Sequence, residues 1–102
     1  MKSFKDAEKV AKVLKNLSHP LRLKILCCLL KKDLYAGDIT ECLGTTKGNI
    51  SQHLNKLLEQ SFIQRQRIAN RHLYSIKDQR VGQLIETIAL LYKTNCKRGD
   101  SL

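Results

Sequence analysis

The chain contains little of several features that other protein classes require. It has no Trp, three Tyr, two Phe and one Pro, and its nine Asp and Glu residues are outnumbered by 19 Lys and Arg residues. The longest apolar run, residues 25–30, is far shorter than the roughly 20 residues that cross a bilayer. The Lys-rich start lacks the apolar segment of a signal peptide, so we expect a cytoplasmic protein with no membrane contact. A chain this short also leaves no room for a deep substrate cleft, which argues against an enzyme.

Positive charge is what the chain has in excess. Its formal net charge is +10, which makes a polyanion such as nucleic acid a natural partner. With 42% hydrophobic and 27% charged residues, the composition is that of a globular protein rather than of a disordered tail. Four cysteines, Cys27, Cys28, Cys42 and Cys96, would suggest disulfides in a secreted protein. Without an export signal we expect them to be reduced thiols.

Apolar residues recur at helical spacing over most of the chain, and one segment alternates as β-strands do. The expected fold is mostly α with a small β-hairpin, in the order α-α-α-α-β-β-α. We expect a single domain over residues 1–102, with 97–102 as a frayed tail. Ser18 is the expected N-cap of the second helix, Gly44 ends the third, Thr45 or Thr46 caps the fourth, and Asn70 is a turn residue with positive φ. The expected helices span residues 4–17, 20–32, 36–43, 47–60 and 79–96, and the expected strands span 62–67 and 71–76.

A helix, a short turn, a polar-faced helix and a basic hairpin are typical of a winged helix-turn-helix, whose second helix enters the DNA major groove. Seven cations and two anions lie between Lys47 and Arg80, so these elements carry a net charge of +5. Phosphate oxygens are the natural counter-charge, and affinity would then fall steeply with salt. Two alternatives to DNA binding stay open at this point: a basic surface that only aids solubility, and a basic face that meets an acidic protein.

Three segments together resemble the ArsR-type winged-helix repressors: LSHPLRLKIL at residues 17–26, ISQHL at 50–54 and LYSI at 73–76. The resemblance covers about residues 14–92. It implies a homodimer paired through the first and last helices, bound to a roughly palindromic double-stranded operator that it represses until an inducer acts. Both terminal helices carry apolar stripes that a small monomer would struggle to cover, which favours the same arrangement.

The resemblance also assigns DNA contacts. Lys47 can donate to guanine, and Gln52 can pair with adenine through two hydrogen bonds. Gly48 departs from the usual Ser of the family and weakens the first turn of the helix. His53 lies beside Leu54, and we expect it to be a hydrogen-bonded core residue rather than a DNA contact. The predicted DNA-binding residues are Thr46, Lys47, Gly48, Asn49, Ser51 and Gln52 on the recognition helix, and Arg65, Arg67, Asn70 and Arg71 on the wing.

The cysteines do not form a familiar metal site, and we expect no metal and no other cofactor. The Cys-x-Cys motif of metal sensors in the family belongs at the start of the third helix, where residues 34–38 contain no thiol. The alternative site on the last helix needs an Asp-x-His pair, whereas here Asp78 is followed by Arg80. No two cysteines have the C-x₂-C spacing of zinc sites, and no His lies near any of them.

A second branch of the family senses reactive sulfur species or oxidants through one cysteine on the second helix and one near the end of the last helix. By this resemblance Cys27 and Cys96 are the redox-sensing pair. Cys28 and Cys42 are expected to be core residues, because free cysteines usually pack as small buried apolar side chains. Cys96 lies about one helical turn further along than the branch pattern has it, which would favour a bridge with extra sulfur atoms over a direct disulfide. Release from the operator by persulfide or oxidative chemistry is the leading hypothesis. A repressor with a metal ion or another inducer, or with none, is the alternative.

Overall fold

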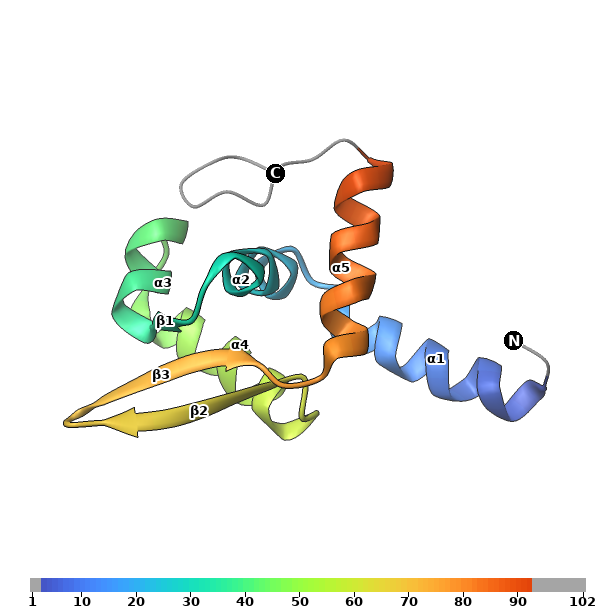
Figure 1. Cartoon of the computed structure of the whole chain (residues 1–102), viewed down its shortest axis with the longest axis horizontal. Coiled ribbons are helices and arrows are strands. Elements are labelled where there is room, and N and C mark those ends of the chain that lie inside the picture. The colour runs from blue at the N-terminus through green and yellow to red at the C-terminus, as the bar shows by residue number, and fades with distance from the viewer. Residues whose placement is uncertain (1–2, 93–102) are drawn as a thin grey trace.

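The computed structural model describes residues 3–92, which form five helices and a small three-stranded sheet (Figure 1). The elements are α1 (Phe4–Leu17), α2 (Pro20–Lys31), β1 (Leu34–Tyr35), α3 (Ala36–Leu43), α4 (Lys47–Glu59), β2 (Ile63–Ile68), β3 (Arg71–Ile76) and α5 (Gln79–Leu91). This confirms the expected mostly α fold with a β-hairpin. Within the described range, no helix is both long and apolar enough to cross a bilayer. Cys96 and the tail 97–102 lie outside it.

The sheet contains a strand that the sequence pattern did not predict. β1, β3 and β2 are neighbours in that order, and both pairings are antiparallel. Leu34 pairs with Tyr74, and Tyr35 pairs with Leu73. A strand of two residues is too short to show an alternating pattern, which is why the sequence indicated only a break between helices there. The hairpin is therefore joined through β1 to the segment that leads directly into α3.

Two local predictions were wrong. Ser18 is the C-cap of α1, and the N-cap of α2 is His19, whose Nδ1 accepts a hydrogen bond from the backbone N–H of Leu21 at 3.1 Å. The imidazole nitrogen thus replaces the expected hydroxyl. In the hairpin turn the positive φ belongs to Ala69 (56°) and not to Asn70. The turn has two residues between the pair Ile68 and Arg71, and a positive φ at the first of them alone is typical of a type II′ turn.

α2 is the central helix of the core. Five consecutive residues, 25–29, are buried, and Ile25 and Leu26 are fully shielded from solvent. Because this stretch is apolar on every side, neighbours must cover it all round, and α2 packs against α3, α4, β3 and α5. α3 and α4 are therefore both packed against α2, the helix that carries Cys27.

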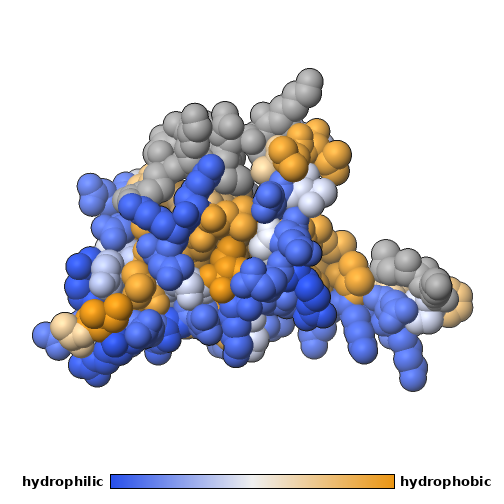
Figure 2. Space-filling model, in the orientation of Figure 1, coloured by the Kyte–Doolittle hydropathy of each residue, from blue (hydrophilic) through white to orange (hydrophobic). Residues whose placement is uncertain are grey.

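α1 stands away from the rest of the molecule, and Figure 1 shows it projecting from the base of α5. Of its residues only Leu17, at its last position, is buried. Phe4 is 91% exposed and Leu14 is 47% exposed. At the far end of α5, Leu90, Leu91 and Tyr92 are each about three-quarters exposed (74%, 73% and 75%). Figure 2 shows hydrophobic patches along α1 and at the end of α5.

Candidate nucleic-acid interface

The turn between α3 and α4 is built by one glycine and two threonines. Gly44 ends α3 in the left-handed conformation (φ 63°), and its N–H donates to the Thr40 carbonyl at 3.0 Å. Thr46 is the N-cap of α4, because its hydroxyl accepts from the backbone N–H of Asn49 at 3.2 Å. The Asn49 side chain donates to the Thr45 hydroxyl at 3.1 Å. Thr46 and Asn49, both predicted DNA contacts, therefore also hold the first turn of the helix in shape.

α4 is amphipathic, with one buried and one solvent face. Ile50, His53, Leu54 and Leu57 are buried against the core. Every predicted DNA-binding residue at its start is exposed: Thr46, Lys47, Gly48, Asn49, Ser51 and Gln52. The helical period of 3.6 residues brings these side chains together on the side away from the core. Because an exposed polar face at the start of the second helix is what enters the major groove, α4 is the recognition helix of this fold.

The hairpin, or wing, carries the predicted arginines on opposite faces. Side chains alternate along a strand, so Arg65 and Arg67 share a face with Ile63, while Arg71 shares the other face with Leu73. Arg67 Nε donates to the carbonyl of Ala69 at 3.1 Å, within the turn. All three arginines and Asn70 are exposed. The structure thus brings Arg65 and Arg67 together and separates them from Arg71.

Arg71 lies instead over a ring at the start of the helix-turn-helix. Its guanidinium carbon is 3.7 Å from the centroid of the Tyr35 ring, a cation–π contact. Tyr35 is the N-cap residue of α3 and belongs to β1. This contact therefore fastens the wing to the helix-turn-helix. Sequence reasoning missed it, because the two residues meet only through the β1–β3 pairing.

His53 is buried on the recognition helix, as predicted from its position beside Leu54. It is 7% exposed, and its Nδ1 accepts a hydrogen bond from Arg22 Nε at 3.2 Å. The His19 ring lies with its centroid 4.2 Å from that of His53. Burial lowers the pKa of His53 below its ordinary value, and the nearby His19 and Arg22 lower it further. The imidazole is therefore held in its neutral form, in which Nδ1 can accept the hydrogen bond from Arg22.

Two of the seven cations between Lys47 and Arg80 form ion pairs within the chain. Arg80 binds Asp78 through two hydrogen bonds, at 3.0 and 3.1 Å, and these bonds lower the pKa of the Asp78 carboxyl. Asp78 is the N-cap of α5, so this pair stabilises the start of that helix. Lys56 lies 3.9 Å from Glu59 on α4. Among residues 3–92, the cations of this region without an ion pair are Lys47, Arg65, Arg67, Arg71 and Lys77.

The described cysteines lie in or beside the core. On α2, Cys27 is 7% exposed and Cys28 is 3% exposed, and Cys42 on α3 is half-buried. The predicted partner of Cys27, Cys96, lies outside the described residues, so the pairing stays a prediction. In the part of the chain from 3 to 92, no group of three or more His, Cys, Asp and Glu side chains lies close enough to hold a metal ion.

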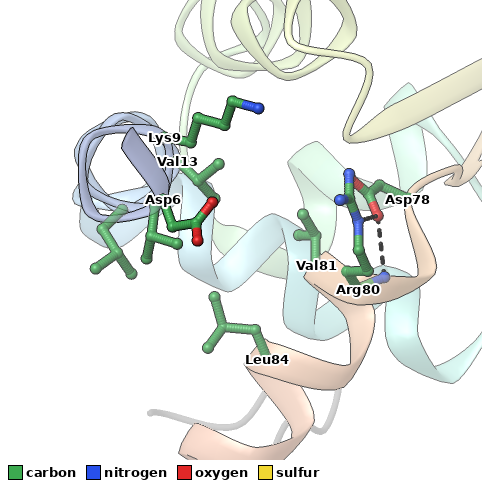
Figure 3. Close-up of a pocket in the computed structure, with 9 residues that line it drawn as sticks. Asp6, Lys9, Val13, Asp78, Arg80, Val81 and Leu84 are labelled. Carbon is green, nitrogen blue, oxygen red and sulfur yellow. Dashed lines mark hydrogen bonds and ion pairs between the residues drawn. The ribbon is translucent and has the colours of Figure 1, made fainter. Parts of the chain in front are cut away.

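A groove of about 580 Å³ separates α1 from α5. Figure 3 shows Val13 of α1 and Val81 and Leu84 of α5 facing the groove, with the Asp78–Arg80 pair at one side. Val10 and Leu14 also line it. The groove thus has apolar side chains from both helices along its walls, and the charged residues Asp6, Lys9, Asp78 and Arg80 also line it.

An exposed polar recognition helix, a basic wing and a tight turn between packed helices define a winged helix-turn-helix DNA-binding protein. The family model described as "Bacterial regulatory protein, arsR family" matches residues 19–65. The HTH-type transcriptional regulator YgaV of Escherichia coli (strain K12) is 41% identical over 85% of this chain and 89% of its own length. The chain belongs to the ArsR family of DNA-binding transcription regulators, and it is therefore a regulator and not an enzyme.

Solved structures agree with this assignment. Reduced HlyU from Vibrio cholerae N16961 superposes with a TM-score of 0.82 at 30% identity, over 86% of this chain and 93% of that one. The transcriptional repressor BigR from Xylella fastidiosa superposes with a TM-score of 0.81 at 28% identity, over 86% of this chain and 90% of that one. The winged helix-turn-helix fold predicted from the sequence is thereby confirmed.

Proposed function

We propose that the protein is a homodimeric transcriptional repressor that binds a roughly palindromic operator through α4 and the wing, and that leaves it when Cys27 and Cys96 react with a persulfide donor or an oxidant. The observation that carries the DNA-binding part is the exposed face of α4, where Lys47, Ser51 and Gln52 point away from the core. BigR, similar to this chain, is named a transcriptional repressor, which supports repression as the outcome of binding.

The base-reading role of α4 is tested by one substitution and a matched control. Gln52→Ala removes an exposed amide at the start of α4, whereas Gln60→Ala removes one at its C-cap, the other end of the same helix. An operator duplex is first selected by the protein from a random library. Gln52→Ala should then weaken operator binding by about 1 to 3 kcal/mol and relax the preference at one base position. Equal binding by both variants would rule out this role for Gln52.

Dimerisation is supported by the exposed apolar side chains of α1 and of the end of α5. Phe4, Leu14, Leu91 and Tyr92 are large apolar side chains between 47% and 91% exposed, and exposed apolar surface of this kind is typical of an interface between proteins. A two-fold axis that pairs these helices would cover them and place two recognition helices one helical turn of DNA apart. Sedimentation equilibrium should give a dimer for the wild type and a monomer for Leu14→Asp. A monomeric wild type at micromolar concentration would contradict the proposal.

The thiol chemistry balances with a polysulfide as the oxidant. The Cys27 thiol takes one sulfur atom, which gives a persulfide and leaves a polysulfide one sulfur shorter. The Cys96 thiolate then attacks the inner sulfur of that persulfide, forms the disulfide and releases hydrogen sulfide. If Cys96 first takes a sulfur atom from a second polysulfide in the same way, its persulfide anion attacks the inner sulfur of the Cys27 persulfide, forms a trisulfide bridge and releases hydrogen sulfide. The position of Cys27 on central α2, which packs against both α4 and α5, supports a link between its chemistry and the DNA-binding surface.

Mobility-shift assays with a polysulfide donor test this mechanism. Release from the operator should occur for the wild type and for Cys42→Ser, whose thiol lies on α3, and should fail for Cys27→Ser and Cys96→Ser. Mass spectrometry of the treated protein should find one bridge between Cys27 and Cys96. If both serine variants are still released, the thiol mechanism is wrong. Release by a metal ion in place of polysulfide would support the alternative inducer.

A further inference from the structure

Arg22 is the side chain that ties three helices together behind the DNA-binding surface. From α2, its Nε donates to Nδ1 of His53 on α4 at 3.2 Å. One terminal nitrogen donates to the backbone carbonyl of Asn16, in the last turn of α1, at 2.8 Å. Asn16 lies on α1, before α2 in the sequence, and His53 lies on α4, 31 positions after Arg22. The guanidinium plane therefore fixes α4 relative to both α2 and α1.

His53 occupies a position from which it can set the orientation of α4. It lies on the buried face, one residue after Gln52 and two after Ser51, both on the solvent face. The rotation of α4 about its own axis decides where those two side chains point. A directional hydrogen bond fixes that rotation in a way that the packing of Leu54 and Leu57 alone does not, because apolar contacts have no preferred direction.

We propose that the Arg22–His53 hydrogen bond positions the recognition helix for sequence-specific DNA binding, and that protonation of His53 breaks this bond and weakens specific binding. His53 is a positioning residue here, since it acts through α4 and does not face the DNA. The proposal rests on the proposed DNA-binding function and names a residue pair that controls it.

Protonation would reverse the role of His53 in this contact. Its Nδ1 is the acceptor, and a protonated imidazole has a donor at both nitrogens and no acceptor. The new positive charge would then lie beside the Arg22 guanidinium and next to His19. Burial, His19 and Arg22 all lower the pKa of His53, so the break occurs as the pH falls below 6.5. Charged groups on the other elements packed against α4 are not among the causes of this shift: Asp38 and Glu41 on α3, and Arg65 and Arg67 on β2.

The experiment compares specific with non-specific DNA binding, using the operator selected above and a random duplex of equal length. His53→Asn keeps an acceptor near the place of Nδ1 but cannot titrate, whereas His53→Leu has no acceptor. Circular dichroism first establishes a temperature at which each variant is folded, because a purely structural role would lower the folded fraction and leave the ratio of the two affinities unchanged.

At about pH 7.5 we expect His53→Leu to lose about tenfold in the ratio of specific to non-specific affinity, and His53→Asn to retain it within about threefold. From about pH 7.5 down to the lowest pH at which both proteins stay folded, the ratio should fall for the wild type and change less than about twofold for His53→Asn. Arg22→Met combined with His53→Leu should lose no more than the worse single variant, since both remove one contact.

Three results would overturn the proposal: an unchanged ratio in folded His53→Leu, the same pH profile for the wild type and His53→Asn, or additive losses in the double variant. If His53→Leu does not fold, the pH profile of His53→Asn against the wild type decides alone. A wild type that selects no duplex at any pH is a different outcome. It would overturn the DNA-binding function itself, and this positioning role with it.

Discussion

Two glycines that flank the same turn should respond to alanine in opposite directions. Gly48 lies at the second position of α4 with ordinary helical backbone, and a Cβ built there meets no atom within 4 Å. Gly44 also has open space around it, but its φ is 63°, in the left-handed region. Alanine at 48 gains helix propensity and restricts the unfolded chain, which is worth about 0.4 to 1 kcal/mol. Alanine at 44 must adopt the left-handed conformation, which costs about 1 to 2 kcal/mol.

For a domain of this size these energies correspond to a rise in Tm of about 2 to 8 °C for Gly48→Ala and a fall of about 4 °C or more for Gly44→Ala. Differential scanning calorimetry at one fixed protein concentration measures both, because association of subunits would make Tm depend on concentration. Gly37→Ala, at the second position of α3 and also in open space, is the matched control and should behave like Gly48→Ala. If the variants at 44 and 48 shift Tm in the same direction, backbone conformation does not decide the outcome and the reasoning fails.

Three further predictions concern the core, the wing and the start of α5. Leu54→Ala should lower the free energy of unfolding in urea by about 2 to 5 kcal/mol, because Leu54 is 1% exposed on the buried face of α4. Tyr35→Leu should destabilise the protein by about 0.5 to 1 kcal/mol through loss of the Arg71 contact, and Tyr35→Phe should not; equal thermal melts for the two would dismiss the contact. Asp78→Ala should cost about 1 kcal/mol at neutral pH as a lost N-cap. Because Arg80 lowers the pKa of Asp78, that cost should persist above pH 3.8 and vanish as the pH falls through the lower folded value, which acid titration of both proteins by circular dichroism would follow.

The helices were predictable from the sequence because their apolar period repeats over two or more turns. The same period identified the exposed face of α4 and placed His53 on the other side. What could not be predicted depends on contacts between distant segments or on local geometry without a repeating pattern. The two-residue strand β1 exists only through its pairing with β3, and Ala69 takes its positive φ from the turn that the strands require.

The candidate site also contains residues that the sequence predicts and residues that only the tertiary structure reveals. Its exposed members follow from periodicity and charge, so Lys47, Ser51 and Gln52 could be named in advance. The groups that hold them in place could not, since each partner pair lies on separate elements: Arg22 with His53, and Arg71 with Tyr35. No spacing rule connects such residues, because the tertiary fold alone decides that they meet.

The short strand β1 has a consequence for how such a regulator changes over time. β1 runs directly into α3, and its pairing with β3 continues across to β2. Main-chain hydrogen bonds therefore help to hold the wing beside the helix-turn-helix, together with the Arg71–Tyr35 contact. Substitutions on the outer face of α4 or at the hairpin tip can alter which bases are preferred without altering the backbone pairing of β1, β3 and β2. The surface that would read DNA and the pairing that supports it therefore depend on different parts of the chain: exposed side chains for the first, and the backbone of β1, β3 and β2 for the second.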